Sequence, residues 1–198
     1  MDISVADPHF WDDRYLNKET GWDMGEISPP LKAYFSQLQD KTISILIPGC
    51  GNSYEAAYLL ENGFSAITLI DISEVLTTRL REKFRDYADS PLRLICDDFF
   101  NLDGQYDLIV EQTFFCALDP SRRKDYVEKM HELLAPGGKL AGLLFDREFP
   151  GGPPFGGSKE EYEELLGSKF TIRSLAPCYN SIWPRANAEV FFIAQKPF

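Results

Sequence analysis

The amino-acid sequence predicts an α/β protein with a doubly wound, mostly parallel seven-stranded sheet in a three-layer α/β/α arrangement. Short apolar runs without clean alternation recur along the chain, as expected for strands that are buried on both faces. Stretches with helical periodicity separate most of these runs, and this alternation is typical of parallel strands joined by crossover helices. The runs assigned to strands cover residues 42–47, 65–71, 91–96, 106–112, 138–145, 170–182 and 188–196.

Helices are expected where residues that favour helix ends flank a periodic stretch. Ser73 is placed to cap the start of one helix, and Gly63 is placed to end another. A proline pair opens a short amphipathic helix that has Leu31 and Phe35 on its apolar face. The expected helices cover residues 28–38, 53–63, 73–88, 121–138 and 159–167.

The last two predicted strands, residues 170–182 and 188–196, follow one another without a helix between them. We therefore expect them to pair as antiparallel strands at one edge of the sheet. The Gly/Pro-rich stretch 149–158 comes before them, after a predicted central strand. It is either a plain connection or a lid over the site.

Length and charge limit the classes of protein to consider. With 198 residues and 44% hydrophobic content, the chain suits one core, so we expect a single domain over residues 1–198. Its 31 acidic and 20 basic residues give a net charge of -11. Such a charge repels phosphate backbones and anionic lipids, so neither nucleic acid nor a membrane is an expected partner. We expect a monomer, although the sequence does not determine the oligomeric state.

The cysteines and the first residues indicate the compartment. The four cysteines are widely separated and form no Cys-x-x-Cys pair, which fits neither a zinc site nor a disulfide framework. We expect no metal. The first residues carry no basic segment followed by an apolar stretch, and no run is long enough to span a bilayer. A cytoplasmic location is therefore expected.

The run "ILIPGCGNSYEAAYLLENGFSAITLIDIS" at residues 45–73 predicts a nucleoside site. Gly49 and Gly51 let the first strand-to-helix turn approach a ligand closely, and Asp71 ends the next strand, where a carboxylate can bind ribose hydroxyls. A dinucleotide site would need a third glycine where this chain has Tyr54. A ligand with a ribose and no phosphates fits best, and S-adenosylmethionine is the common one. The alternatives are an ordinary turn for the glycines and a helix N-terminal carboxylate for Asp71.

Several motifs together resemble a known family. They are, in order, "FWDDRYLNKETGWDMGEISPPL", "LIPGCGNSYEAAYL", "DDFF", "EQTFFCALDPSRR" and "PPFGGSKEEYEELL". In sequence and spacing these motifs resemble the thiopurine S-methyltransferase-like family of class I S-adenosylmethionine-dependent methyltransferases. The family includes halide and thiol methyltransferases, to which "TFFCALDP" is most similar. The resemblance implies a Rossmann-like fold, with S-adenosylmethionine as cofactor and S-adenosylhomocysteine as product.

The resemblance also implies a set of cofactor-binding residues. The glycine loop would line the methionine end, Asp71 would bind the ribose, and Asp98 would accept a hydrogen bond from the adenine amino group. A cap made of residues 1–40 would place aromatic side chains over the sulfonium, which gains from cation–π contact. The implied cofactor-binding residues are Trp11, Tyr15, Trp22, Gly49, Cys50, Gly51, Asp71, Ile72, Asp98, Phe99, Glu111, Gln112 and Thr113.

On the acceptor side the resemblance suggests fewer residues. Phe114, Phe115 and Cys116 would line the acceptor pocket, together with Tyr179 and Arg185. Tyr179 and Asp146 are the only catalytic candidates, and no convincing general base is found. The alternatives are an edge-strand aromatic for Tyr179, a turn carboxylate for Asp146 and a salt bridge for Arg185. Some relatives carry arginine where this chain has Gln112, which argues against an anionic acceptor at that position.

The expected function is the transfer of a methyl group to a small nucleophile by in-line displacement. The nucleophile would be a thiol or thiopurine sulfur, or a halide or thiocyanate. The first alternative is a non-catalytic relative that binds S-adenosylmethionine, and the second is a methyltransferase with another oxygen or nitrogen acceptor. A nicotinamide oxidoreductase is disfavoured by Tyr54 in the glycine loop.

Overall fold

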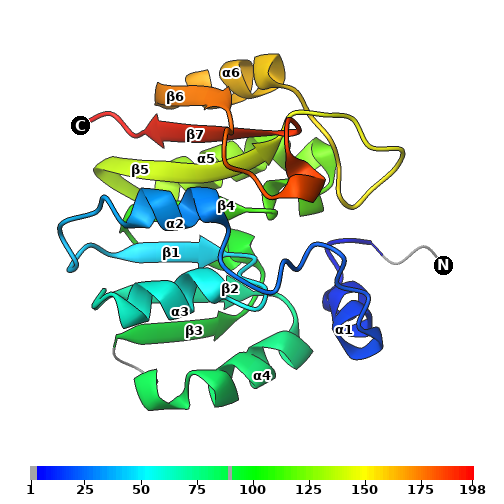
Figure 1. Ribbon diagram of the computed structural model, residues 1–198, viewed down its shortest axis with the longest axis vertical. Helices are drawn as coiled ribbons and strands as arrows, with labels where there is room; N and C mark the ends of the chain where they lie inside the picture. Colours follow the sequence, from blue (N-terminus) through cyan, green and yellow to red (C-terminus); the bar gives the residue numbers. More distant parts are fainter. Residues whose placement is uncertain (1–3, 89–90) are drawn as a thin grey trace.

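The sheet has seven strands in the order β3-β2-β1-β4-β5-β7-β6 (Figure 1). The computed structural model describes residues 4–88 and 91–198, so the first three residues of the predicted cap lie outside the described part. Pairing is parallel from β3 to β5, and β7 runs antiparallel to both β5 and β6. The strands are β1 Ile45–Pro48, β2 Ile67–Asp71, β3 Leu92–Cys96, β4 Tyr106–Gln112, β5 Leu134–Phe145, β6 Thr171–Pro177 and β7 Glu189–Gln195.

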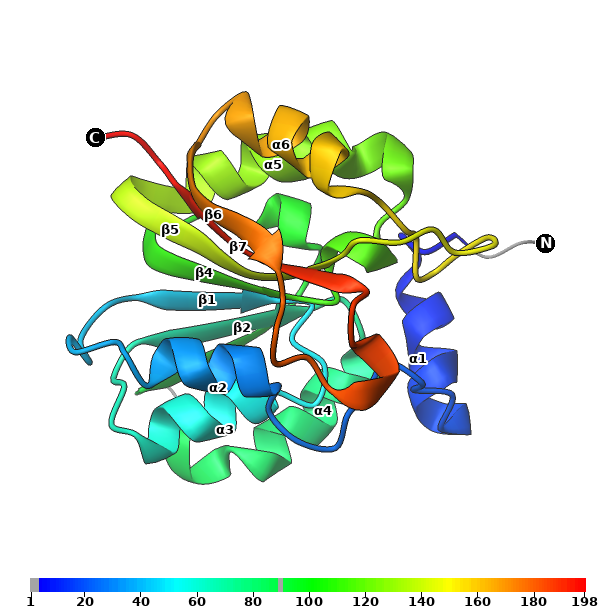
Figure 2. The ribbon, with the colours of Figure 1, turned by 45° about the horizontal axis from the view of Figure 1, so that its top comes forward.

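Helices cover both faces of this sheet (Figure 2). One hydrophobic core lies under α2, α3 and α4, and a second lies under α5 and α6. None of the helices in the described ranges is long and apolar enough to cross a membrane. The predicted α/β/α fold class is confirmed. The helices are α1 Pro8–Asn17, α2 Pro29–Phe35, α3 Tyr54–Glu61, α4 Glu74–Lys83, α5 Arg123–Leu133 and α6 Lys159–Gly167.

Many of the predicted element ends agree with the structure, but residues 134–137, predicted as helix, begin β5, and the strand predicted over 170–182 ends at Pro177. The Ser73 side chain accepts a hydrogen bond from the Leu76 N–H and caps α4, and Gly63 ends α3 with φ +82°. The edge strands pair as expected, with β7 one position inside the edge strand β6. Helix α1 was not predicted, although Asp7 and Pro8 provide its N-cap and first-turn proline.

Helix α1 and the chain after it form the cap at the carboxyl edge of the parallel strands (Figures 1 and 2). The Asp12 carboxylate accepts hydrogen bonds from the Ser73 hydroxyl at 2.5 Å and the Val75 N–H at 3.0 Å, at the start of α4. By contrast, α2 packs on a sheet face with Leu31 and Phe35 fully buried. Within the predicted segment 1–40, α2 thus belongs to the helical layer, and the term cap is used below for residues 4–28.

Gly63→Ala should lower the free energy of unfolding by about 1 kcal/mol, because Gly63 has φ +82° and a left-handed conformation disfavours a Cβ atom. A Cβ there would meet nothing within 4 Å, so the change in the free energy of unfolding reports the backbone conformation and no steric clash. Urea unfolding measures it. The matched control is Gly167→Ala at the end of α6, which also has open space but no positive φ and should be neutral or slightly stabilising. Equal effects of the two substitutions would contradict the assignment.

Candidate functional site

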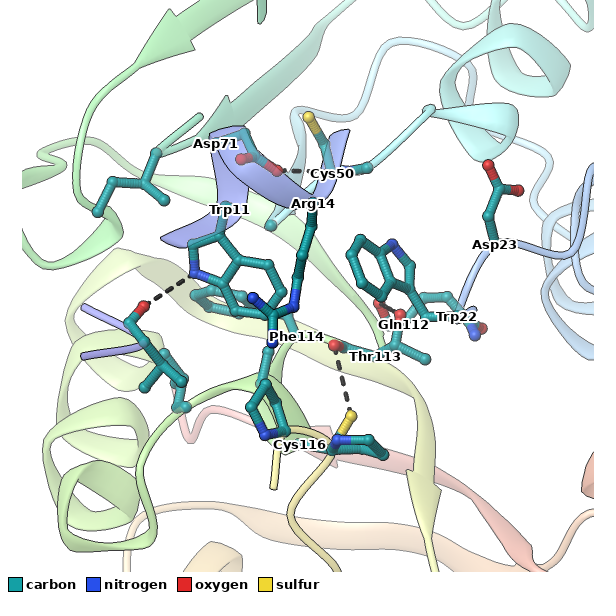
Figure 3. Close-up of a pocket in the computed structure, with 18 of the residues that line it drawn as sticks. Trp11, Arg14, Trp22, Asp23, Cys50, Asp71, Gln112, Thr113, Phe114 and Cys116 are labelled. Atoms are coloured by element: carbon teal, nitrogen blue, oxygen red, sulfur yellow. Dashed lines mark hydrogen bonds between the residues drawn. The ribbon is translucent and has the colours of Figure 1, made fainter. Parts of the chain in front are cut away.

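A cavity of about 760 Å³ lies at the carboxyl edge of the sheet, beneath the cap (Figure 3). It is lined by the loops after β1, β2, β3 and β4, by the Gly/Pro loop after β5 and by the cap. β1 and β4 are neighbours in the sheet although not in sequence, and such a switch point is where open α/β sheets bind ligands. Of the predicted site residues, the lining includes Trp11, Tyr15, Trp22, Gly49, Cys50, Gly51, Asp71, Ile72, Asp98, Phe99, Gln112, Thr113 and Arg185.

The glycine loop leaves space for a ligand on one side and none on the other. Gly49 and Gly51 have φ +54° and +50°, which a residue with a Cβ atom rarely adopts. A Cβ on Gly49 would lie 2.3 Å from Cδ2 of Phe114, so the loop packs against that ring. A Cβ on Gly51 would meet only the Tyr15 hydroxyl, at 4.0 Å. The backbone at Gly51 is therefore open to the cavity.

Asp71 fixes the loops that follow two neighbouring strands. Its carboxylate accepts a hydrogen bond from the Gly51 N–H at 3.3 Å and another from the Ser73 N–H at 3.0 Å. The side chain is buried, and this burial, reinforced by the nearby Asp12 carboxylate, raises its pKa from 3.8 to about 6 despite those bonds. A carboxylate at this position borders the cavity and can accept further hydrogen bonds.

The loop after β3 lines the same side of the cavity. One oxygen of Asp98 accepts a hydrogen bond from the Phe100 N–H at 2.9 Å. The Phe99 ring packs edge-to-face on Phe114, with 5.1 Å between ring centroids. Because Phe99 is only 4% exposed, it supports the floor of the cavity more than it covers a ligand.

Three aromatic side chains of the cap form one cluster that lines the cavity, and two of them, Trp11 and Trp22, are labelled in Figure 3. The Trp22 ring meets Trp11 and Tyr15 edge-to-face, at centroid distances of 5.6 and 5.8 Å. The Trp11 indole N–H donates to the Val5 carbonyl at 2.8 Å, and Arg185 donates to the Trp22 carbonyl at 2.7 Å. The cluster is thus held from both the cap and the segment before β7.

The end of β4 differs from the prediction at Glu111. This side chain is fully buried and does not line the main cavity; its carboxylate accepts the Phe114 and Phe115 N–H groups at 2.8 and 2.9 Å. Burial raises its pKa from 4.5 to about 7. Direct contact with a ligand in the cavity, as predicted, therefore does not fit its position. Gln112 does line the cavity, and its side-chain oxygen is buried without a hydrogen-bond partner among the described residues.

Three predicted acceptor-side residues also lie outside the cavity lining. Phe115 is buried in the core, where its ring packs on Tyr162, whereas Phe114 and Cys116 line the cavity as expected. Tyr179 is 93% exposed on the loop between β6 and β7. Asp146 accepts the Lys159 N–H at 3.0 Å and so serves the start of α6, as the turn-carboxylate alternative expected. The structure gives no support for a direct role of these side chains in catalysis.

Several arginines of the lining were not predicted. Arg14 faces the cavity from α1 (Figure 3), Arg122 lies in the short helix η4 Pro120–Arg122 after β4, and Arg147 follows β5. Among residues 4–88 and 91–198, Arg14 and Arg147 form no salt bridge, whereas Arg122 pairs with Asp125 at 2.7 Å. Arg185 pairs with the buried Glu189 at 3.4 Å, as the salt-bridge alternative expected. Arg14 follows Trp11 by three residues, so helical spacing would have placed both on one face had α1 been predicted.

Outside the cap, the lining is divided by charge; the cap itself contributes Arg14 together with Glu19, Asp23 and Glu26. The loops and helix starts that follow β1, β2 and β3 contribute only carboxylates among their charged lining residues, and we call this the acidic side. The segments after β4, after β5 and before β7 contribute three arginines together with Asp119, and we call this the arginine side. The acidic side comprises Glu55, Asp71, Asp97 and Asp98, and the arginine side comprises Arg122, Arg147 and Arg185.

Solved structures share this fold. A 1,6-didemethyltoxoflavin-N1-methyltransferase from Burkholderia thailandensis, with S-adenosylhomocysteine bound, has a TM-score of 0.74 at 20% identity, covering 100% of this chain and 94% of that one. Magnesium protoporphyrin IX methyltransferase from Synechocystis PCC 6803, with SAH bound, has a TM-score of 0.73 at 13% identity, covering 96% and 99%. The fold is that of the S-adenosylmethionine-dependent methyltransferases.

The chain belongs to the thiopurine S-methyltransferase family, whose model matches residues 6–189. A probable thiol methyltransferase 2 from Arabidopsis thaliana is 32% identical over 160 residues, covering 79% of this chain and 70% of that protein. A thiopurine S-methyltransferase from Pseudomonas fluorescens strain SBW25 is 30% identical over 188 residues, covering 85% and 86%. The resemblance of the motifs is confirmed, and fold and family together define a methyltransferase.

The raised pKa of Asp71 predicts a pH-dependent stability. An acid whose pKa rises from 3.8 to about 6 on folding lowers the stability of the ligand-free protein as the pH climbs through that window. The free energy of unfolding of Asp71→Asn should therefore exceed that of the wild type. This excess should be about 1 kcal/mol larger at pH 8 than at pH 5. Urea unfolding at both pH values measures this gain. Asp86→Asn, in the exposed turn η1 Arg85–Tyr87, is the control. A gain in the free energy of unfolding of Asp71→Asn that does not change with pH would contradict the prediction.

Proposed function

We propose that the protein binds S-adenosylmethionine in this cavity and catalyses transfer of its methyl group to a small anionic nucleophile, a thiolate, halide or thiocyanate. The observation that supports this proposal most is the division of one cavity into an acidic side with an open glycine loop and an arginine side. S-adenosylmethionine carries a cationic sulfonium, and an anionic nucleophile has the opposite charge. The cytoplasmic location and monomeric state expected from the sequence belong to the same proposal.

The acidic side and the aromatic cluster suit the cofactor. Asp71 would accept hydrogen bonds from the ribose hydroxyls, and Asp98 one from the adenine amino group. The open backbone at Gly51 leaves room for the methionine part, and the side-chain oxygen of Gln112, without a partner among the described residues, can accept a hydrogen bond from it. The cap aromatics would face the sulfonium, where cation–π contact is worth about 0.5 to 2 kcal/mol. The bound cofactor supplies the electrophilic methyl group.

The arginine side suits a nucleophile that arrives already ionised. Neither Tyr179 nor Asp146, the two candidate catalytic side chains, lines the cavity, so deprotonation of a bound alcohol or amine has no support from them. A halide or thiocyanate needs no deprotonation, and a thiol is ionised more easily than an alcohol. The relatives named thiol, thiopurine and thiocyanate methyltransferases act on such sulfur groups. Catalysis would then consist mainly of holding the nucleophile in line with the methyl group.

Titration calorimetry with S-adenosylhomocysteine, followed by a methyl-transfer assay with labelled cofactor, tests this function. The acceptor panel is thiophenol, thiocyanate, iodide, phenol and aniline. We expect micromolar binding and turnover of the sulfur and halide acceptors. Binding without any turnover would favour the non-catalytic alternative, and turnover of phenol or aniline alone would favour the oxygen or nitrogen alternative. Absence of binding at high micromolar concentrations would overturn the proposal.

Arg14→Gln should raise the KM for thiocyanate about fivefold, because it removes a cation without a salt bridge from the cavity wall. The affinity for S-adenosylhomocysteine should change less than twofold. Initial rates at low and high salt measure the effect, which screening should reduce. Arg81→Gln, at an exposed position of α4, removes the same charge away from the cavity and serves as control. An equal rise in KM for both variants would mean that only the net charge matters.

A further inference from the structure

The carboxylate of Glu111 holds the turn that follows β4. One oxygen accepts both the Phe114 and Phe115 N–H groups, and the other accepts the Tyr126 hydroxyl at 2.6 Å. The neighbouring strand β5 packs tightly on the backbone of this residue, since a Cβ on Gly142 would clash with the Glu111 carbonyl oxygen. Within the described residues this carboxylate therefore has its hydrogen bonds satisfied inside the protein and none directed to the cavity.

These hydrogen bonds impose an unusual backbone on the turn. Thr113 has φ +58°, a conformation that a β-branched residue adopts only when its surroundings require it. The reversal at Thr113 brings the next two N–H groups back to Glu111 and turns the Phe114 side chain toward the cavity. Without an acceptor at Glu111, two buried N–H groups would lose their partner and the left-handed residue would lose its support.

The same turn contacts both sides of the cavity. On the acidic side, the Phe114 ring lies against Gly49 and against Phe99. On the arginine side, the Cys116 carbonyl accepts the Phe155 N–H at 2.6 Å and so fixes the Gly/Pro loop. Phe149, Pro153 and Pro154 of that loop line the cavity. A shift of the turn would therefore displace the wall of the acceptor region together with the loop that covers it.

We propose that Glu111 is a positioning residue for methyl transfer, which fixes the turn 113–116 and through it the place of the nucleophile opposite the methyl group. The inference rests on the proposed function. The groups suggested for ribose and adenine, Asp71 and Asp98, lie at other strands and have their own hydrogen bonds. Loss of Glu111 should consequently impair transfer far more than cofactor binding.

Glu111→Ala should lower kcat for thiophenol and thiocyanate about 100-fold, the loss expected from a misplacement of about 1 Å. The Kd for S-adenosylhomocysteine should stay within threefold of the wild type. Glu111→Gln should recover kcat to within about fivefold, because an amide oxygen still accepts both N–H groups. A Glu111→Ala enzyme with kcat within threefold of the wild type would overturn the inference. So would a Gln variant as impaired as the Ala variant, or a cofactor affinity that falls in parallel with kcat.

If Glu111→Ala does not fold, as judged by circular dichroism, a matched pair of tyrosine variants carries the test. Tyr126→Phe removes one hydroxyl from the Glu111 carboxylate and should lower kcat about fivefold at unchanged Kd. Tyr162→Phe removes an equally short 2.6 Å bond, to the Phe145 carbonyl, without touching Glu111, and should leave kcat unchanged. Equal effects of the two variants would overturn the inference. Failure of the proposed function is distinct from these outcomes, because the wild type would then neither bind S-adenosylhomocysteine nor methylate an acceptor.

Discussion

The site depends on backbone N–H groups that have no strand to pair with once the parallel sheet ends, and on the carboxylates that accept them. Asp71 binds the loops that follow β1 and β2, Asp98 binds the turn after β3, and Glu111 binds the turn after β4. Buried N–H groups need a partner, and an ionised or neutral carboxyl group can serve several at once. The raised pKa values of Asp71 and Glu111 show the desolvation that this arrangement requires.

The distribution of charge over the cavity lining also reconciles the strongly acidic chain with an anionic nucleophile. The net charge of -11 would by itself repel a thiolate or thiocyanate. The acidic side concentrates carboxylates where a cationic cofactor would lie. Arg147 of the arginine side and Arg14 of the cap line the cavity without a salt bridge in the described part of the chain. Near a bound acceptor, the local field would thus be set by these two arginines and not by the overall charge.

The sequence was sufficient to predict the sheet, its edge pairing and the residues that regular elements place at the carboxyl edge, such as Asp71 at the end of β2. The sequence was not sufficient to predict side-chain direction in a tight turn. Phe114 and Phe115 are neighbours, and only the hydrogen bonds to Glu111 decide which ring reaches the cavity. The exposure of Tyr179 could not be predicted for a related reason, since it follows from the path of an irregular loop that carries no periodicity.

The most direct measurement of the central claim is a crystal structure of the protein with S-adenosylhomocysteine. We expect the two ribose hydroxyls at hydrogen-bond distance from the Asp71 carboxylate, and the thioether sulfur between the cap aromatics and the turn 113–116. The Glu111 carboxylate should keep its bonds to the Phe114 and Phe115 N–H groups. A ribose bound away from Asp71, or a sulfur directed away from the arginine side, would contradict the account.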